Sequence, residues 1–257
     1  MTPYELLLPS EGFAAERFPL IRSEAEERGG SLNSPDSFLL LSEAAMALRE
    51  VREDDDGAEM VQRHGALLFQ AFHFWEGEHP LLLLDDEVVR FLVENGPEEG
   101  TWIPALPGKS GYVQLPQHMV WAVSGEGEAP ESLDGLFWAM PDGENLTILV
   151  VMGIRKDRPG LGVVSLPTLP LAAAVPWASM PVRPEGVDFS TDLPGAELEG
   201  LYAIEAGGEA VKLAMRIFWY LDVFPGRVDD SSEPPEARDD APKPSSLPYY
   251  RIVVDQS

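Results

Sequence analysis

The residues of this chain that could perform acid–base or metal chemistry are four histidines and 44 carboxylates. His73, Glu76 and His79 follow one another at a spacing of three residues. On a helix this spacing spreads three side chains over an arc of about 120°, whereas a compact metal-binding pair needs an i, i+4 spacing. His118 lies in an apolar run, and no carboxylate can be paired with it from the sequence. We therefore predict no metal site and no cofactor.

Two glycine-containing segments match only part of a nucleotide-binding motif. Gly108-Lys109-Ser110 has the end of a phosphate-binding loop, but Ile103 occupies the position of its first glycine. Gly160-Leu161-Gly162 has Ser165 at the position of the third glycine of a dinucleotide fingerprint, and no helical pattern follows. The chain also lacks a G-x-S-x-G elbow and any cysteine nucleophile. No catalytic signature is therefore predicted.

Five residues are candidates for binding another protein. Trp102 and Trp177 lie in proline-rich connecting segments, where a large ring is not needed to fill a regular layer and serves as a binding anchor. Arg155, Lys156 and Arg158 form a basic cluster in a strongly acidic chain and fall on an expected turn. The alternatives are core filling by the tryptophans and ion pairing of the basic residues with the protein's own acids.

The charge of the chain restricts the class of partner. The formal net charge is −26 at pH 7, from 44 acidic and 18 basic residues. Nucleic-acid phosphates and anionic lipids repel so acidic a chain, so we expect a protein partner, no direct nucleic-acid binding and no membrane. Solubility, adaptation to high salt and mimicry of a nucleic-acid backbone would each explain the acidity. We find no signal peptide and no apolar run of membrane-spanning length, which predicts a cytoplasmic location.

The sequence pattern places a sheet in the middle of the chain. Between Gly111 and Pro167, four short apolar runs rich in Val, Ile, Phe, Trp and Tyr are separated by loops rich in Gly, Pro, Glu and Asp. This pattern predicts an antiparallel meander. The segment Pro141-Asp142-Gly143-Glu144 is typical of a turn because Asp-Gly accommodates positive φ angles. Residues 101–170 carry seven acids and four bases, so the predicted sheet is the least acidic part of the chain.

Helical patterns precede this sheet. We expect a short helix near residues 23–28 and a second helix that starts at Ser34-Pro35-Asp36. A third helical pattern includes Trp75 and ends before Pro80, and a fourth runs from Asp85-Asp86 to Asn95.

The C-terminal part has a proline-rich segment, a long helix and a final strand. Prolines exclude a long helix from Pro167 to Pro184, so we expect an extended segment there that covers the sheet or lines a groove. Residues 227–246 are acidic and rich in Pro and Ser, which predicts a disordered loop before a final strand at 247–254. Residues 205–224 are expected to form a mostly buried helix with one polar stripe, made of Glu205, Glu209, Lys212 and Arg216.

Together these patterns predict an α+β fold, in which an N-terminal helical layer packs on an antiparallel β-meander. One further buried helix and a C-terminal strand complete it. Residues 1–100 form the mainly helical region and residues 101–257 the sheet region, either as two units or as one continuous domain. The leading functional hypothesis is a non-catalytic protein-binding or regulatory protein. The alternatives are a hydrolase-type enzyme that joins distant carboxylates to His118 or His73, with or without a metal, and an acidic mimic of nucleic acid.

Overall fold

The structure is a computed structural model of the 257-residue chain. It describes residues 2, 17–35, 37–47, 65–78, 80–102, 104, 106–116, 119–123, 131–152, 162–182, 202–205, 207–224, 228–229, 247 and 249–254. Within these ranges, no helix is long and apolar enough to cross a membrane.

Helices and strands are mixed along the chain. The helices are α2 (Phe18–Glu27), α3 (Ser37–Ala47), α5 (Gly65–Glu76), α6 (Asp86–Glu94), α7 (Leu171–Ala174), the 3₁₀ helix η2 (Val175–Ser179) and α9 (Gly208–Val223). The strands are β1 (Leu81–Leu84), β2 (Ser110–Gln114), β3 (Val120–Val123), β4 (Glu131–Ala139), β5 (Asn145–Met152), β6 (Gly162–Ser165), β7 (Leu169–Pro170), β8 (Tyr202–Glu205), β9 (Val228–Asp229) and β10 (Tyr250–Ile252).

The strands form one mixed sheet with the order β6-β5-β4-β2-β1-β10-β9. The strands β2, β4, β5 and β6 pair antiparallel, as the central apolar runs predict. β1 is parallel to both of its neighbours, β2 and β10, and β3 is parallel to β8. The α+β class, the helices packed on the sheet and the return of the C-terminal strand are confirmed, while the parallel pairs are an addition that the sequence did not predict.

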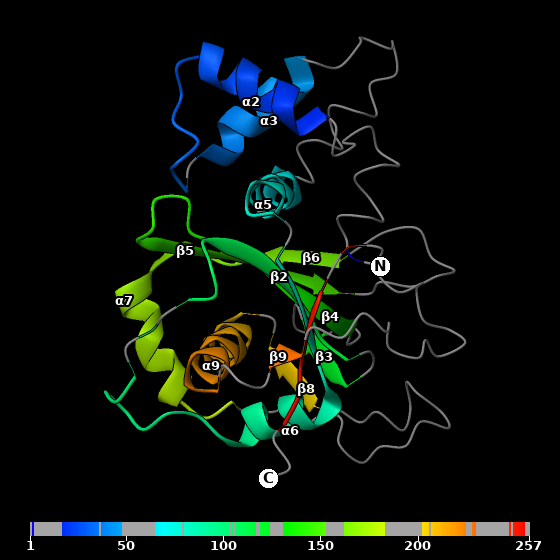
Figure 1. The fold of residues 1–257 in the computed structure, drawn as a ribbon, viewed down its shortest axis with the longest axis vertical. Coiled ribbons are helices and arrows are strands. Elements are labelled where there is room, and N and C mark those ends of the chain that lie inside the picture. The colour runs from blue at the N-terminus through cyan, green and yellow to red at the C-terminus, as the bar shows by residue number, and fades with distance from the viewer. Residues whose placement is uncertain are drawn as a thin grey trace, which may run out of the picture.

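The sheet is covered on both faces, so its central strands are buried on both sides (Figure 1). α5 packs on one face, against Tyr112, Phe137 and Leu149, and α2 and α3 lie on the far side of α5 (Figure 1). α6, α7, η2 and α9 belong to the core on the other face, which includes Val113 and Trp138. Successive side chains of a strand point to opposite faces, and because both faces are covered, β4 is buried at every position from Ser132 to Ala139.

Several element boundaries follow local sequence signals. α6 ends at Glu94, next to Asn95-Gly96, and its first turn carries Asp86 and Glu87, whose charges suit a helix N-terminus. The predicted turn after β4 is confirmed. Gly143 has φ +78°, and the Asp142 carboxylate accepts hydrogen bonds from the backbone N–H groups of Glu144 and Asn145.

Other elements differ from the predictions. β1 follows Pro80 inside the region expected to be helical, so residues 1–100 supply a strand to the interior of the sheet. The first apolar run of the meander is divided into β2 and β3, and Glu205 ends β8 instead of beginning a helix. Leu171–Ser179 is helical and not extended. Val228–Asp229 pairs with β10, and the rest of the predicted loop 227–246 lies outside the described residues.

Candidate protein-binding surface

The structure separates the two tryptophans that the sequence singled out. Trp102 is buried, with 8% of its surface exposed, and its Nε1–H donates to Asp222 Oδ2 at 2.9 Å, near the end of α9. Trp177 lies in η2 beside Gly208, the first residue of α9. Because a helix rises about 1.5 Å per residue, the two ends of α9 lie about 20 Å apart. The two rings therefore do not form one binding site.

The basic cluster Arg155, Lys156 and Arg158 lies outside the described residues, and so does His118. The binding and acid–base roles expected of these residues stay predictions.

An aromatic surface lies where α6 meets the end of α9. We call it the α6–α9 aromatic face and define it as Phe91, Trp219, Val223 and Phe224. The rings of Phe91 and Trp219 are stacked, with centroids 6.2 Å apart and an interplanar angle of 11°. The Phe224 ring stands edge-on to both, at 6.5 Å from Phe91 and 6.1 Å from Trp219. Val223 is 48% exposed, and the three rings are half-buried.

The core beneath this face holds its rings in place. Tyr220 is buried and contacts Phe91 at 5.7 Å and Phe224 at 5.0 Å between ring centroids. Its hydroxyl donates to the Val253 carbonyl at 2.9 Å, which connects α9 to the residue after β10. A ring that is fixed before binding loses little conformational entropy when a partner covers it. The α6–α9 aromatic face is therefore suited to be an anchor.

Two acidic side chains of α6 lie beside the same face. Glu87 and Glu94 are exposed and lie one helical turn before and after Phe91 on α6, so they share its side of the helix. Residues 85–102 carry six acidic side chains and one basic side chain, Arg90. The combination is a half-exposed aromatic centre with an acidic rim.

Arg216 holds α9 against α6 and η2, and so fixes the geometry of the face. Its side chain is only 3% exposed. The guanidinium donates to four backbone carbonyls, at distances of 2.7 to 3.0 Å, which belong to Leu92, Val93, Ala178 and Met180. The first two end α6, where carbonyls have no intrahelical donor. Burial lowers the pKa of Arg216 and the charge of Glu209 raises it, and a guanidinium remains protonated at neutral pH.

The burial of Arg216 corrects the prediction of a polar stripe along α9. η2 packs on that side of the helix, so Arg216 serves as an internal donor and not as a surface residue. Gly96 belongs to the same arrangement. A Cβ atom at Gly96 would lie 2.5 Å from the Ala178 carbonyl oxygen and 3.0 Å from Arg216 Nε.

His73, the other histidine considered for catalysis, is enclosed by side chains. It is 5% exposed and stands edge-on to Phe69 and Phe72, at centroid distances of 4.6 and 5.4 Å. Its Nδ1 lies 3.1 Å from Glu76 Oε2, and Glu76 also pairs with Arg22. A histidine packed in this way offers a substrate no approach, which weakens the enzyme hypothesis for His73. Within the described part of the chain, no group of three or more acidic or histidine side chains could hold a metal ion.

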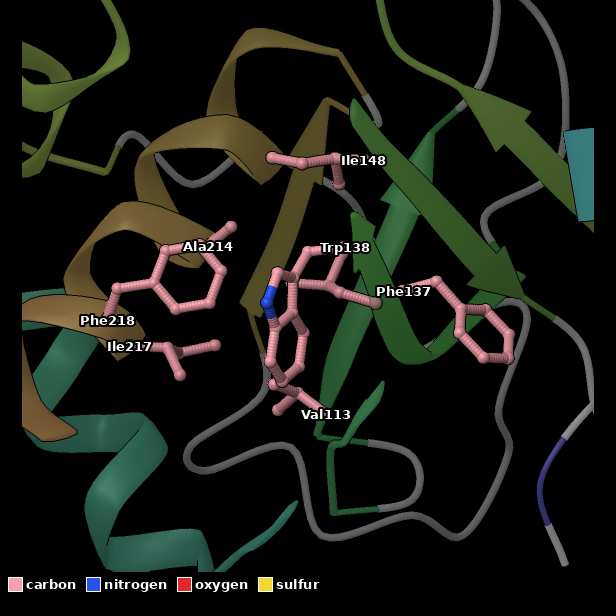
Figure 2. A pocket seen from close by; sticks show the side chains of 8 residues that line it. Val113, Phe137, Trp138, Ile148, Ala214, Ile217 and Phe218 are labelled. Atoms are coloured by element: carbon pink, nitrogen blue, oxygen red, sulfur yellow. The ribbon is translucent and has the colours of Figure 1, made fainter. Parts of the chain in front are cut away.

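Figure 2 shows an apolar pocket inside the core, between α9 and the face of the sheet that α9 covers. Trp138 points into it and meets Phe218 of α9 edge-on, with ring centroids 5.4 Å apart, while Phe137 points to the other side of the strand. Gly111, opposite Trp138 in register, is necessary here because an added Cβ would lie 2.0 Å from the indole. The pocket is too narrow for a water molecule and its lining is apolar, so it is a packing defect of the core and not a ligand site.

A second group of apolar side chains is exposed on α2 and α3, namely Leu20, Phe38 and Leu39. Leu20 and Leu39 each lie about half a turn of helix from the buried positions of their own element. Singly exposed apolar residues are common on proteins and need no functional explanation. They provide useful control positions.

Sequence reasoning missed Phe91, Trp219, Val223 and Phe224, although it selected Trp102, which contacts the same end of α9. The available signal was the i, i+4 spacing of Trp219 and Val223, which places both apolar side chains on the same side of α9. That spacing does not reveal which side of α9 faces solvent.

Comparison with known proteins supplies no family for this chain. No protein-family model matches the sequence, and no curated protein is significantly similar to it. Function is therefore inferred from side-chain geometry and charge.

Proposed function

We propose that this chain is a non-catalytic protein-binding protein and that the α6–α9 aromatic face contacts its partner. The observation that supports this most is the stacked pair of Phe91 and Trp219, which is half-exposed yet supported from below by Tyr220. Large aromatic side chains at the centre of an interface provide most of the binding energy in many complexes. The rings of Phe91, Trp219 and Phe224 pack on the core with one part of their surface and leave the other part open to a partner.

The magnitudes agree with an anchoring role. Covering one large aromatic side chain contributes about 2 kcal/mol or more at the centre of an interface. Phe91 and Trp219 would therefore contribute about 4 kcal/mol together, which is about half of the roughly 8 kcal/mol that micromolar binding requires. The rest of the interface would have to supply the remainder and offset the entropic cost of association.

The test is partner capture with matched surface variants. Val223→Glu places a charge on the face, one helical turn from Trp219. Leu20→Glu makes the same chemical change on α2, which lies on the opposite side of the sheet (Figure 1). Both positions are about half exposed, at 48% and 57%, so both variants are expected to fold. Circular dichroism spectra and urea unfolding midpoints check that both variants fold.

The expected result is a stoichiometric partner recovered from native lysate by the unmodified protein and by Leu20→Glu, but not by Val223→Glu. Repeated recovery of the protein alone would contradict the proposal. Equal recovery of the partner by all three proteins would show that binding uses another surface.

A further inference from the structure

We propose that the occupant of the α6–α9 aromatic face is a basic amphipathic segment of another protein. Its apolar side chains pack on Phe91, Trp219 and Val223, and its Lys or Arg side chains lie over Glu87 and Glu94. This inference rests on the proposed function and adds the chemistry of the partner to it.

Charge complementarity is the first support. Glu87 and Glu94 flank Phe91 on one side of α6, and both are exposed. Arg90 lies within one helical turn of both, so the two glutamates outnumber the one cation beside them and the rim has a net negative charge. Opposite charges across an interface accelerate association and exclude partners of the same charge. A neutral or acidic segment would leave at least one of the two glutamates without a cation, because Arg90 is the only basic side chain of α6 and lies within one helical turn of both.

The second support is a contact within the protein itself. On α2, the Arg22 guanidinium lies 5.8 Å from the ring centroid of Phe72 and 5.4 Å from that of Trp75. The same guanidinium pairs with Glu76. This is a cation held by two aromatic rings and one carboxylate. The α6–α9 aromatic face offers the same three groups, which are Phe91, Trp219 and a glutamate, to a cation from outside.

A second copy of this chain fits the face less well. Each copy has a formal charge of −26, so two copies repel each other.

The experiment uses the full chain and a defined probe. The probe is a fluorescein-labelled peptide of about five helical turns, with leucines on one side and arginines on the other. Its binding is followed by fluorescence anisotropy at about 50 and about 300 mM salt. Two further peptides carry glutamate in place of arginine, or serine in place of leucine.

The matched variants are two double substitutions with the same change in net charge. Glu87→Gln with Glu94→Gln removes the rim, and Glu26→Gln with Glu27→Gln removes two exposed acids from α2. The rim variant is expected to weaken binding of the leucine–arginine peptide about three- to tenfold, because each exposed ion pair contributes modestly. The α2 variant should change it less than about twofold, because distant exposed charges are screened. Raised salt should weaken binding, and the glutamate and serine peptides should not bind.

Several outcomes would overturn the inference. Equal loss for both double variants, or equal binding of the serine peptide, would show that general charge attraction explains the binding. Failure of the leucine–arginine peptide to bind would also refute it, as would a dimer of this chain that Val223→Glu dissociates. If a native partner depends on Val223 but not on Glu87 and Glu94, this inference fails while the proposed function stands.

Discussion

Replacing Arg216 with methionine should destabilise the protein by about 3 kcal/mol, a value that follows from two opposing terms. Three of the four hydrogen bonds donated by Arg216 are buried, and a buried carbonyl left without a donor costs about 1 to 3 kcal/mol, or about 3 to 9 kcal/mol for three. Removing the charge recovers several kcal/mol of desolvation free energy. We expect the cost of the unpaired carbonyls to exceed the recovered desolvation free energy, because methionine fills the space of the arginine but donates no hydrogen bond.

The assay is urea unfolding followed by tryptophan fluorescence, with the free-energy change taken from the shift in midpoint at constant slope. Arg216→Lys should lose about 2 kcal/mol, since an ammonium group keeps the charge but has three donors for four carbonyls. Lys212→Met is the matched control, because Lys212 lies on the same side of α9 and donates to the Glu209 carboxylate and, among the described carbonyls, to that of Pro181 at 3.3 Å. A loss below about 1 kcal/mol for Arg216→Met, or one no larger than that of the control, would refute the assigned role.

Two further predictions concern pH and a buried hydroxyl. Tyr112→Phe should raise stability by about 1 kcal/mol at neutral pH, because the Tyr112 hydroxyl is buried with no hydrogen-bond partner in the described part of the chain. Burial, and then the nearby charge of Asp134, raises the pKa of Tyr112 well above its usual value. The native protein should therefore lose more stability than the variant as the pH rises beyond about 10. Urea midpoints of both proteins across this range test the prediction, and a clear loss of stability for the variant at pH 7 would contradict it. At Asp142, slight burial acts to raise the pKa, but hydrogen bonds from Asn145 and Glu144 outweigh it and hold the pKa below its ordinary value. The stabilisation from this carboxylate is therefore present above about pH 4 and is lost as the pH falls through the lowered pKa. The difference in melting temperature between the native protein and Asp142→Ala should narrow on acidification. A difference that stays constant would contradict this prediction.

The candidate surface shows where prediction from sequence stops. Trp102 was selected because it lies in an irregular segment, and it does contact Asp222 at the end of α9. The half-exposed rings of the face, however, are those of Phe91, Trp219 and Phe224. Phe91 and Trp219 lie in regular helices, where the sequence does not distinguish an apolar residue at the surface from one in the core. Their exposure depends on how α6 crosses α9, and that crossing is held by Arg216 through carbonyls more than 30 residues away in the chain.

Local patterns were sufficient wherever a short segment decides its own conformation. The Asp142-Gly143 turn, the first and last turns of α6, and the strands β4 and β5 all depend on neighbouring residues, so they could be predicted from the sequence. So could the α+β class, because buried strands and amphipathic helices have different apolar periods.

Long-range packing decided the rest. The run Leu81–Leu84 is as apolar as a helix core, and it becomes a strand because β2 and β10 supply backbone partners on both sides. Arg216 has the residue type of a surface cation, yet it is buried because four backbone carbonyls from α6, η2 and Met180 converge on it. Hydrogen-bond partners distant in sequence leave no local pattern, so only the tertiary structure could assign these residues.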